Sequence, residues 1–328
     1  MNSRRFLPLF IATLLLAGCS KEQPAAPVGG DFLNDPNVFP TASDWSPERA
    51  PLVFMSGRSG NAEIYRVDPG DTTWVNLTRN EAGDNWPEWS PDGAQILFHS
   101  DRNGKYDVFL MNADGSGLVQ LTTHEDHDYV PSWTPDGRIA FTSWRQEAAD
   151  TSRAAHVYTM AADGSNQERL GLADGAPVSG ARFGPDGKTI VFGRENGDGT
   201  ADLYLATMDD LTGRKITAGG AYFGDPAFSP DGKWVAYYSD RQNGSDLLVQ
   251  DIASALVDTA LSGGANWYPR FSPDGRWMLS CTETSHGNFD VLYFPLDGTA
   301  PAHPLVASPR RDCEARWSPV TAPAPAVP

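Results

Sequence analysis

A five-residue pattern recurs along the chain: an aromatic residue, a small residue and then Pro-Asp-Gly. Complete copies begin at Trp89, Trp133, Phe183, Phe228 and Phe271, and truncated copies begin at Trp45 and Trp317. Successive aromatic residues in this series are 44, 44, 50, 45, 43 and 46 positions apart. A period of this length, filled with short strands and turns, predicts a β-propeller in which each repeat forms one blade.

The repeat from Asp84 to Thr122 shows the plan of one blade. Turn residues separate four predicted strands, at 87–89, 95–100, 106–111 and 118–122. In the first turn, Pro91 sets φ, Asp92 bonds to its own backbone and Gly93 takes a positive φ. A four-stranded sheet buries both faces only when it packs between two neighbours. The sequence holds six such units, so we expect an all-β fold, a six-bladed β-propeller of four-stranded antiparallel blades.

The motif that begins a blade occurs seven times, although the sequence holds six complete repeats. The extra copy indicates how the ring closes. Asp lies five residues before both Trp89 and Trp317, whereas Pro40 has that place before Trp45. The carboxy-terminal copy therefore fits the pattern better. We expect residues 312–317 to supply the innermost strand of the first blade, which removes a free sheet edge.

The amino terminus has the layout of a secretion signal. Arg4 and Arg5 make it positive, and the apolar run at 6–16 is too short to span a bilayer of about 30 Å as a permanent helix. Leu-Ala-Gly-Cys at 16–19 resembles the bacterial lipoprotein processing box. The resemblance implies cleavage before Cys19, a diacylglycerol on its thiol, and anchoring in the cell envelope, at the outer membrane in a two-membrane host. An ordinary signal peptide with an incidental cysteine is the alternative.

The chain then divides into four parts by composition. We expect a lipoprotein signal peptide at 1–18, a flexible tether at 19–42, the β-propeller at 43–319 and a disordered tail at 320–328. The tether and tail are rich in Pro, Ala and other residues that carry no strand or helix period. The membrane is therefore expected to be reached through the lipid anchor only, and the propeller is expected to be monomeric.

Charge limits the partners. The formal net charge is −17, and loss of Arg4 and Arg5 with the signal peptide, without loss of an acid, leaves −19. Such a surface repels phosphate backbones, so no nucleic-acid partner is expected. It attracts basic peptides or divalent cations. Acidic residues that only keep a secreted protein soluble are the alternative.

Cysteine is sparse. Besides Cys19, the chain has Cys281, at the end of the second strand of the sixth blade, and Cys313, at the start of the closing strand. Both positions fall at the same rim of adjacent blades, so a disulfide between them is possible in an oxidising periplasm. Two buried free thiols are the alternative.

No common catalytic motif is present: the sequence has no Gly-x-Ser-x-Gly, no phosphate loop and no His-Glu-x-x-His. No cofactor is expected, apart from a divalent cation as one option. Its candidate ligands are His124, His127 and Asp128, in the densest cluster of imidazole and carboxylate groups. A solvated acidic loop is the alternative.

Two dipeptides, Asp101-Arg102 and Asp240-Arg241, recur after second strands and are followed by further acids such as Asp107. Their recurrence in several blades indicates a structural acid–base pair that holds each turn, because a catalytic residue need occur only once.

A binding face is expected at the rim that carries the loops into each first strand and after each second strand. These loops vary between blades and bring aromatic and charged residues to the mouth of the ring. The candidates are Asp84, Trp86, Arg102, Asp128, Tyr129, Arg145, Tyr222, Phe223, Asp225, Arg241, Trp267 and Tyr268. Packing between blades is the alternative for about half of the aromatic residues.

The repeat resembles the PD40, or WD40-like, β-propeller repeat of the TolB family. The resemblance rests on Asp-x-x-Pro-x-Trp-Ser-Pro-Asp-Gly at 84–93, Ser-Asp-Arg-x-Gly at 100–104 and Asn-x-Asp-Gly at 112–115. In that family it implies a six-bladed propeller that is periplasmic and binds the peptidoglycan-associated lipoprotein. Similar repeats form the gating propeller of prolyl oligopeptidase-type peptidases.

These inferences favour a lipid-anchored, non-enzymatic scaffold that binds a protein or peptide of the cell envelope. One alternative is a metal-assisted polysaccharide lyase or hydrolase that uses the candidate cation ligands. Another is a regulatory propeller for a separate peptidase. Loops that recognise partners follow no code that one sequence reveals, so the partner is not identified.

Overall fold

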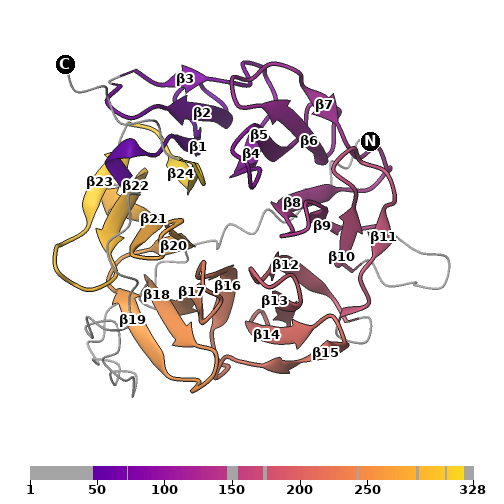
Figure 1. Cartoon of the computed structure of the whole chain (residues 1–328), viewed down its shortest axis with the longest axis vertical. Helices are drawn as coiled ribbons and strands as arrows, with labels where there is room; N and C mark the ends of the chain where they lie inside the picture. Colours follow the sequence, from indigo (N-terminus) through magenta and orange to yellow (C-terminus); the bar gives the residue numbers. More distant parts are fainter. Residues whose placement is uncertain are drawn as a thin grey trace, which may run out of the picture.

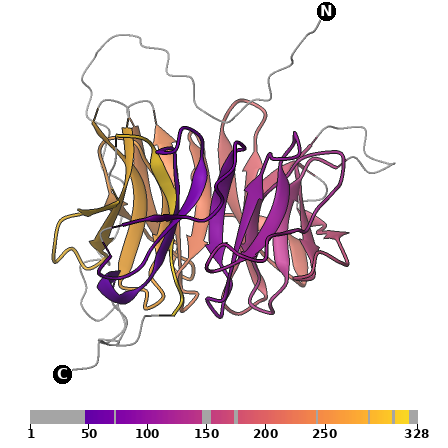
Figure 2. The same cartoon turned by 90° about the horizontal axis from the view of Figure 1, so that it is seen from above.

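The computed structural model describes residues 47–71, 73–145, 154–172, 176–241, 244–285, 288–306 and 309–320. The strands of this part of the chain form six blades around a common axis, which gives a short, broad ring (Figures 1 and 2). The fold is therefore the all-β propeller that the repeat predicts. The proposed signal peptide, the tether with Cys19, Trp45 and residues 321–328 lie outside the described residues.

In blades 1 to 3 the strands succeed one another from the axis outward. Blade 1 consists of β24 (Asp312–Trp317), β1 (Leu52–Ser56), β2 (Glu63–Val67) and β3 (Val75–Asn76). Blade 2 consists of β4 (Asp84–Trp89), β5 (Gln95–Ser100), β6 (Asp107–Asn112) and β7 (Val119–Gln120). Blade 3 consists of β8 (Asp128–Trp133), β9 (Ile139–Ser143), β10 (His156–Met160) and β11 (Glu168–Arg169).

Blades 4 to 6 follow the same plan. Blade 4 consists of β12 (Val178–Phe183), β13 (Thr189–Glu195), β14 (Ala201–Thr207) and β15 (Asp210–Lys215). Blade 5 consists of β16 (Tyr222–Phe228), β17 (Trp234–Arg241), β18 (Gly244–Asp251) and β19 (Val257–Leu261). Blade 6 consists of β20 (Asn266–Phe271), β21 (Trp277–Ser285), β22 (Asn288–Pro295) and β23 (His303–Val306). A single parallel bridge between Ala201 and Tyr222 connects blades 4 and 5.

Helical structure is minor. A 3-10 helix, η2 (Pro47–Arg49), precedes β1. Within the described ranges, the molecule contains no helix with the length and apolar character needed to cross a lipid bilayer.

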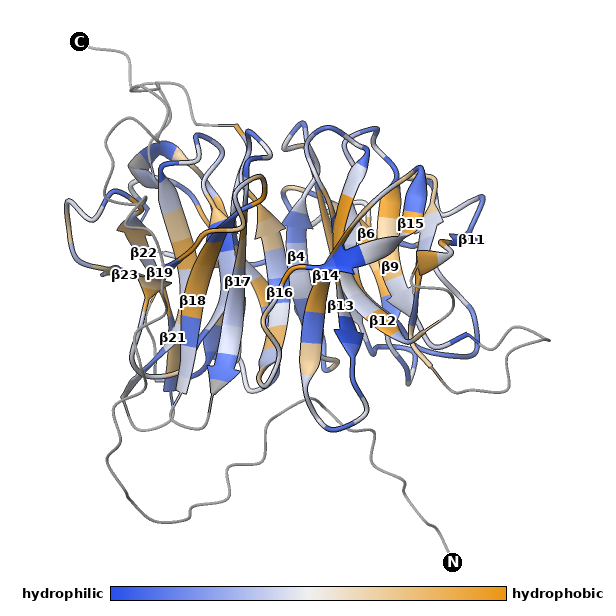
Figure 3. Ribbon diagram, turned by 90° about the horizontal axis from the view of Figure 1, so that it is seen from below, coloured by the Kyte–Doolittle hydropathy of each residue, from blue (hydrophilic) through white to orange (hydrophobic). Residues whose placement is uncertain are grey.

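The apolar runs of the middle strands are buried on both faces because each blade lies between two others. In β5, Ile96 and Phe98 pack with Val53 of blade 1, whereas Leu97 between them packs with Ile139 of blade 3. This is the alternation of a β-strand, in which successive side chains point to opposite faces. Figure 3 shows hydrophobic residues along the strands and many hydrophilic residues in the loops at both ends of the ring. Burial of the apolar residues between blades is the main stabilising contribution.

The recurring Pro-Asp-Gly forms the hairpin between the first and second strands of a blade. After β4, the Ser90 hydroxyl donates a 2.6 Å hydrogen bond to Asp92 Oδ1, which also accepts the amide of Ala94 at 3.0 Å. Gly93 has a φ of 71° and donates its amide to the Ser90 carbonyl at 2.8 Å. A side chain would be strained at this φ, so the turn requires glycine.

The two ends of the propeller meet in blade 1. β24 is antiparallel to β1, from Trp317 opposite Leu52 to Asp312 opposite Ser56. Trp317 also packs with Leu279 of blade 6, so it lies in the seam between the first and last blades. The carboxy-terminal copy of the motif is thus the innermost strand of blade 1, as expected from its aspartate.

Candidate functional site

The innermost strands of all six blades contain a β-bulge at one shared position. The register of each strand with its partner shifts there, for example between Asn85 and Glu88 of β4. The bulge residue with positive φ is Trp86 (58°), Val130 (50°), Gly180 (63°), Asp225 (48°), Tyr268 (56°) or Glu314 (57°). Positive φ is uncommon outside glycine and is an outlier in a β-branched residue, so the fold imposes it.

We call these six residues the upper ring, because they occupy the same position in the six innermost strands around the axis. The rings of Trp86 and Tyr268 make an edge contact with centroids 5.1 Å apart, although blade 1 lies between their two blades. Glu314 of blade 1 accepts the Trp86 amide at Oε2, at 2.7 Å. The backbone is the same in six blades while the side chain differs in every one. At the position of the upper ring, the amino acid is therefore not conserved among the repeats of this chain.

The ionisable groups of the upper ring have shifted pKa values. Burial raises the pKa of Asp225 and that of Glu314, and nearby arginines oppose the rise in both cases. Burial also raises the pKa of Tyr268, as do the charges of Asp225 and Glu314. The Tyr268 phenol is therefore a neutral donor at physiological pH, close to two carboxyl groups whose protonated forms burial favours.

A second level, which we call the lower ring, lies two residues further along each innermost strand. Its members are Glu88, Ser132, Arg182, Ala227, Arg270 and Arg316. Burial lowers the pKa of Arg270 well below its ordinary value, and Arg316 and Arg182 lower it further. Burial likewise lowers the pKa of Arg316, to about 10. Arg182 also lowers the pKa of Arg316. Because blades 4 and 1 lie on opposite sides of the ring, this effect indicates that both side chains extend toward the axis.

His99 of β5 packs against two residues of the upper ring, Trp86 and Val130. His99 stacks on Trp86 at 5.8 Å, meets Tyr106 edge-on at 5.0 Å, and accepts the Val130 amide at Nδ1 at 3.3 Å. Burial lowers the pKa of His99 to about 3, so it is neutral at physiological pH. The polar contact of His99 thus fixes the bulge of the neighbouring blade.

The structure places the predicted face residues in different environments. Trp86, Asp225 and Tyr268 belong to the upper ring. Tyr129 precedes the bulge of blade 3, where its hydroxyl accepts Trp144 Nε1 at 2.8 Å and burial raises its pKa to about 12.

The other aromatic candidates are used mainly in packing. Trp267 stacks on Phe289 at 4.7 Å, Tyr222 stacks on Tyr238 at 6.2 Å, and Phe223 is buried in the core between blades 4 and 5. The side chain of Arg241 lies outside the described part of the chain.

Four charged candidates pair with each other beneath the surface. Arg102 Nη2 lies 2.9 Å from Asp84 Oδ1, and Arg145 Nη2 lies 2.7 Å from Asp128 Oδ2. Both aspartates are fully buried. Arg102 also donates to Ser100 Oγ at 3.0 Å and lies over the ring of Phe109. These pairs join the first strand of a blade to the end of its second strand, so the charged groups of both partners already have a structural role within the blade.

The recurrent acids are structural, as their repetition indicates, but their partners differ from a simple Asp-Arg pair. Asp107 accepts Lys105 Nζ and lies 3.3 Å from Thr122 Oγ1. Asp101 accepts the Gly83 amide at 2.7 Å. Each acid therefore fixes a loop or the last strand of its blade.

The candidate metal ligands do not converge. Asp128 is occupied by Arg145, His127 Nδ1 accepts the Tyr106 amide at 3.0 Å, and His124 faces Asp126 at 3.6 Å. Over the residues that the structure describes, no three His, Cys, Asp or Glu side chains are grouped to hold a metal ion. The cation site stays a prediction, and in this structure the three candidate side chains turn to different partners.

The cysteines meet at the seam between blades 6 and 1. Cys281 of β21 and Cys313 of β24 have Cα atoms 5.1 Å apart and are joined as a disulfide. This separation is within the limit of about 7 Å for a bridge. Both residues are buried beside Met55. The bond links the two blades at the point of closure.

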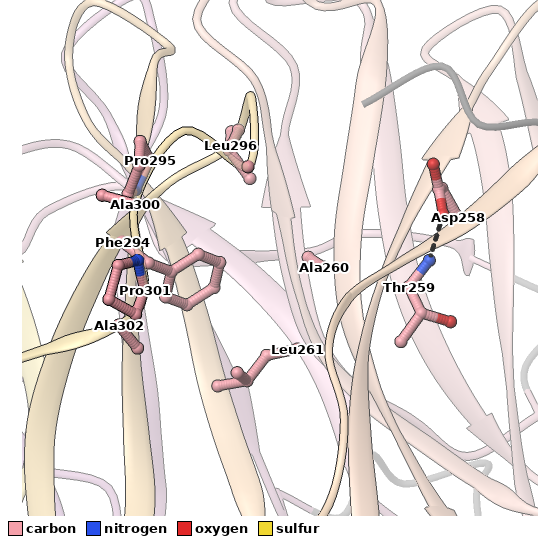
Figure 4. A pocket seen from close by; sticks show the side chains of 11 residues that line it. Asp258, Thr259, Ala260, Leu261, Phe294, Pro295, Leu296, Ala300, Pro301 and Ala302 are labelled. Atoms are coloured by element: carbon pink, nitrogen blue, oxygen red, sulfur yellow. Dashed lines mark hydrogen bonds between the residues drawn. The ribbon is translucent and has the colours of Figure 1, made fainter. Parts of the chain in front are cut away.

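A pocket on the outside of the ring lies between blades 5 and 6. It is lined by residues 258–261 of β19 and by Phe294 and the turn after β22. Figure 4 shows Phe294 and Leu261 turned toward each other, while the Asp258 carboxylate accepts the Thr259 amide at 2.8 Å. No predicted site residue lines this pocket, which is a gap between outer strands.

Sequence reasoning missed Glu88, Arg182, Arg270, Arg316 and Glu314. An alignment of the repeats on their aromatic residue would have found them, because they occupy the positions one and three residues before it. The turns give the repeat its recognisable pattern, whereas these positions within the strand vary from blade to blade.

Two family models match the chain. The TolB beta propeller domain, PD40, matches residues 151–322, and the Tricorn protease N-terminal beta propeller domain matches residues 59–201. A segment of 53 residues is 38% identical to the Tol-Pal system protein TolB of Desulfosudis oleivorans. The match covers 16% of this chain and 12% of that protein, so it spans a small part of this relative's length.

Solved structures share the fold at low sequence identity. TolB from Acinetobacter baumannii superimposes with a TM-score of 0.70 at 20% identity, over 82% of this chain and 66% of that chain. An oligogalacturonate lyase in complex with manganese superimposes with a TM-score of 0.54 at 14% identity, over 78% of this chain and 73% of that chain. At such identities the similarity shows the fold alone, and one fold serves binding proteins and enzymes alike.

Proposed function

Because the chain belongs to the PD40 family of TolB β-propeller domains, we propose that it is a non-enzymatic scaffold that binds a protein or peptide at the ring axis. The observation that carries the proposal is the upper ring. One bulge, repeated in six blades, places six different residues around the axis, and five of them are non-glycine residues held at a positive φ. Strain of this kind persists only where the surrounding structure enforces it. The shared backbone conformation holds the six residues in place, and the differences among these residues give the site its specificity for a partner.

The chemistry of the upper ring suits a peptide. Trp86 and Tyr268 are half-buried and in mutual contact, and these residue types dominate the binding energy of protein interfaces. The indole N–H of Trp86 is buried and has no hydrogen-bond partner among the residues that the structure describes, so it is an unused donor at this level. Asp225 is half-buried at the same level, and its carboxyl group adds a hydrogen-bonding group beside the two aromatic residues. The net charge of −17 favours a basic partner over the surface as a whole.

The proposal places the protein in the cell envelope, held by a lipid on Cys19. The support is the processing box at 16–19 and the similarity to a protein of the Tol-Pal system. The tether at 19–42 would let the propeller reach a partner at some distance from the membrane.

The two alternatives have less support than the scaffold. The metal-assisted lyase or hydrolase loses its candidate ligands, since Asp128 is held by Arg145 and the two histidines face elsewhere. A regulatory propeller for a separate peptidase would use the same axis, and its support is the match to the Tricorn propeller domain at 59–201.

Cross-linking in intact envelopes tests the proposal. We expect the wild-type protein to be captured with a defined protein, and the variant Trp86→Ala, Tyr268→Ala to lose about nine-tenths or more of that capture, as expected for aromatic residues at the centre of an interface. The matched control is Leu118→Ala, Val119→Ala, at exposed residues on the outside of blade 2. Equal capture by both variants, at equal folded amounts by circular dichroism, would reject the upper ring as the binding site.

A further inference from the structure

We propose that the lower ring binds a small oxyanion, either the carboxylate of a peptide or a free anion such as phosphate, between Arg182, Arg270 and Arg316. This site goes beyond the function proposed above and does not depend on it. The shared conformation of the three arginines, their unpaired donors and the positions of the nearby acids support it.

The three arginines adopt one conformation in three blades. Arg182 Nη1 donates to the carbonyl of the preceding Ala181 at 3.0 Å, and Arg316 Nη1 donates to that of Ala315 at 2.9 Å. Arg270 Nη1 donates to the carbonyl of Pro269 at 2.6 Å. A bond to the preceding carbonyl fixes each side chain against its own strand, so the three guanidinium groups are held in place before any ligand arrives.

These guanidinium groups are buried without an ionic partner. Arg182 is 9% exposed, and Arg270 and Arg316 are each 7% exposed. Arg182 Nε, Arg270 Nη2 and Arg316 Nη2 have no hydrogen-bond acceptor in the part of the chain that the structure describes. Among the described residues, no carboxylate forms an ion pair with any of the three. A buried cation without a paired anion is costly, so a site of this kind favours an anion that supplies the missing acceptors.

None of the nearby acids that the structure describes directs its carboxylate to these arginines, and two of them accept backbone amides instead. Glu88, the acid of the lower ring, accepts the Trp133 amide at 3.0 Å. Glu314 of the upper ring accepts the Trp86 amide at 2.7 Å. Asp225 meets Arg270 through its backbone carbonyl, at 3.3 Å, and not through its carboxylate. The acids moderate the positive charge at the axis but leave the arginine donors unpaired.

The geometry and access of the lower ring favour a small oxyanion. Guanidinium groups bind carboxylate and phosphate oxygens through paired N–H donors. The remaining positions include the short side chains of Ser132 and Ala227, so only four of the six residues are long. Glu88 and Asp225 are half-buried, which shows that solvent reaches the axis at both levels.

Titration of the purified mature chain, with Cys19→Ser to keep it in solution, tests this inference. The probes are sodium phosphate and sodium acetate at constant ionic strength in chloride, and binding is followed by calorimetry and by the shift in Tm. We expect saturable binding of one oxyanion per chain, weakened about tenfold or more in Arg270→Lys and in Arg316→Lys, which keep the charge but lose the planar fork. Arg214→Lys, at an exposed arginine of β15, is the matched control and should bind as the wild type does.

A peptide competition experiment identifies the source of the anion, and the wild-type titration keeps the test valid if a variant fails to fold. A short peptide with a free carboxyl terminus, compared with its amide, competes with phosphate if the natural ligand is a peptide carboxylate; phosphate binding without such competition assigns a free oxyanion. The wild-type titration does not require that any variant folds. If neither salt nor peptide binds saturably to the wild type, or if both lysine variants bind as the control does, the inference is overturned. Capture at the upper ring would stand in that case.

Discussion

At the scale of single residues, buried polar groups show which side chains serve the fold. Asp84 and Asp128 have the charge and position of binding residues, yet each is fully buried and paired with an arginine of its own blade. Removal of one partner of such a pair costs about 3 kcal/mol or more, because the other charge stays buried. The bridging arginine also lies over aromatic rings, which adds to its structural role.

His99 gives a prediction at this scale. Its pKa is lowered to about 3 in the folded chain, from 6.5 when unperturbed. Because the folded-state pKa is the lower one, its contribution to stability is fully present above pH 6.5 and is lost as the pH falls toward 3. Each pH unit in this window lowers the free energy of unfolding by up to about 1.4 kcal/mol.

We therefore expect His99→Gln, which keeps an acceptor for the Val130 amide but gains no charge in acid, to flatten the pH dependence of stability between pH 6.5 and 4. Urea unfolding at a series of pH values measures this slope. The control His303→Gln, at an exposed histidine, should retain the wild-type slope. An unchanged slope in His99→Gln would show that the imidazole is not buried in its neutral form.

At the scale of elements, the innermost strand combines two functions. Its start and end are fixed by the aspartate, the aromatic residue and the turn, which are common to several blades. Between them, the bulge places one residue of each strand at the axis with a positive φ. A bulge can re-aim a side chain without disturbing the ladder on either side. The variable residues therefore change without loss of the blade.

Closure by β24 gives a second prediction. The disulfide between Cys281 and Cys313 spans a sequence separation of 32 residues, for which chain entropy predicts a stabilisation of about 3 to 4 kcal/mol. We expect reductant to lower the free energy of unfolding of the wild type by about this amount and to leave Cys281→Ala, Cys313→Ala unaffected. Peptide mapping without reduction should recover the two cysteines in one linked pair. Two free thiols at these positions would contradict the bridge.

At the scale of the whole molecule, closure of the ring makes distant residues neighbours. Blades 2 and 6 are not adjacent, yet Trp86 and Tyr268 touch at the axis. Arg182 and Arg316 stand on opposite sides, and Arg182 still lowers the pKa of Arg316. A site at the centre of a ring is thus composed of one residue from each repeat.

The lipid anchor is a prediction for the molecule as a whole. We expect the wild-type protein to partition with membranes and to carry acyl chains on Cys19, because several chains on one residue suffice for stable anchoring. Cys19→Ser should move the protein to the soluble fraction of the envelope, whereas Cys281→Ala should remain with the membrane. Fractionation followed by mass spectrometry of the amino-terminal peptide decides the point. A wild-type protein found in the soluble fraction would refute the anchor.

The period, the turns and the number of blades can be predicted from the order of amino acids alone, because each depends on local chemistry. Pro-Asp-Gly closes a hairpin wherever it occurs, and Asp312 marks the closing strand by its distance from Trp317. Trp86, Asp225 and Tyr268 could also be found as candidates, since they stand out by residue type.

Which side chains reach the axis follows instead from the three-dimensional arrangement of the blades. Glu314 and Arg316 are two residues apart, so a regular strand would place them on one face. The bulge between Cys313 and Arg316 alters this pattern, and alternation alone does not show which positions reach the centre. The partner of Asp84 is Arg102, far along the chain, because antiparallel pairing brings the start of one strand to the end of the next. The arginines of the lower ring meet because the ring closes, a long-range event that no segment of the sequence encodes alone.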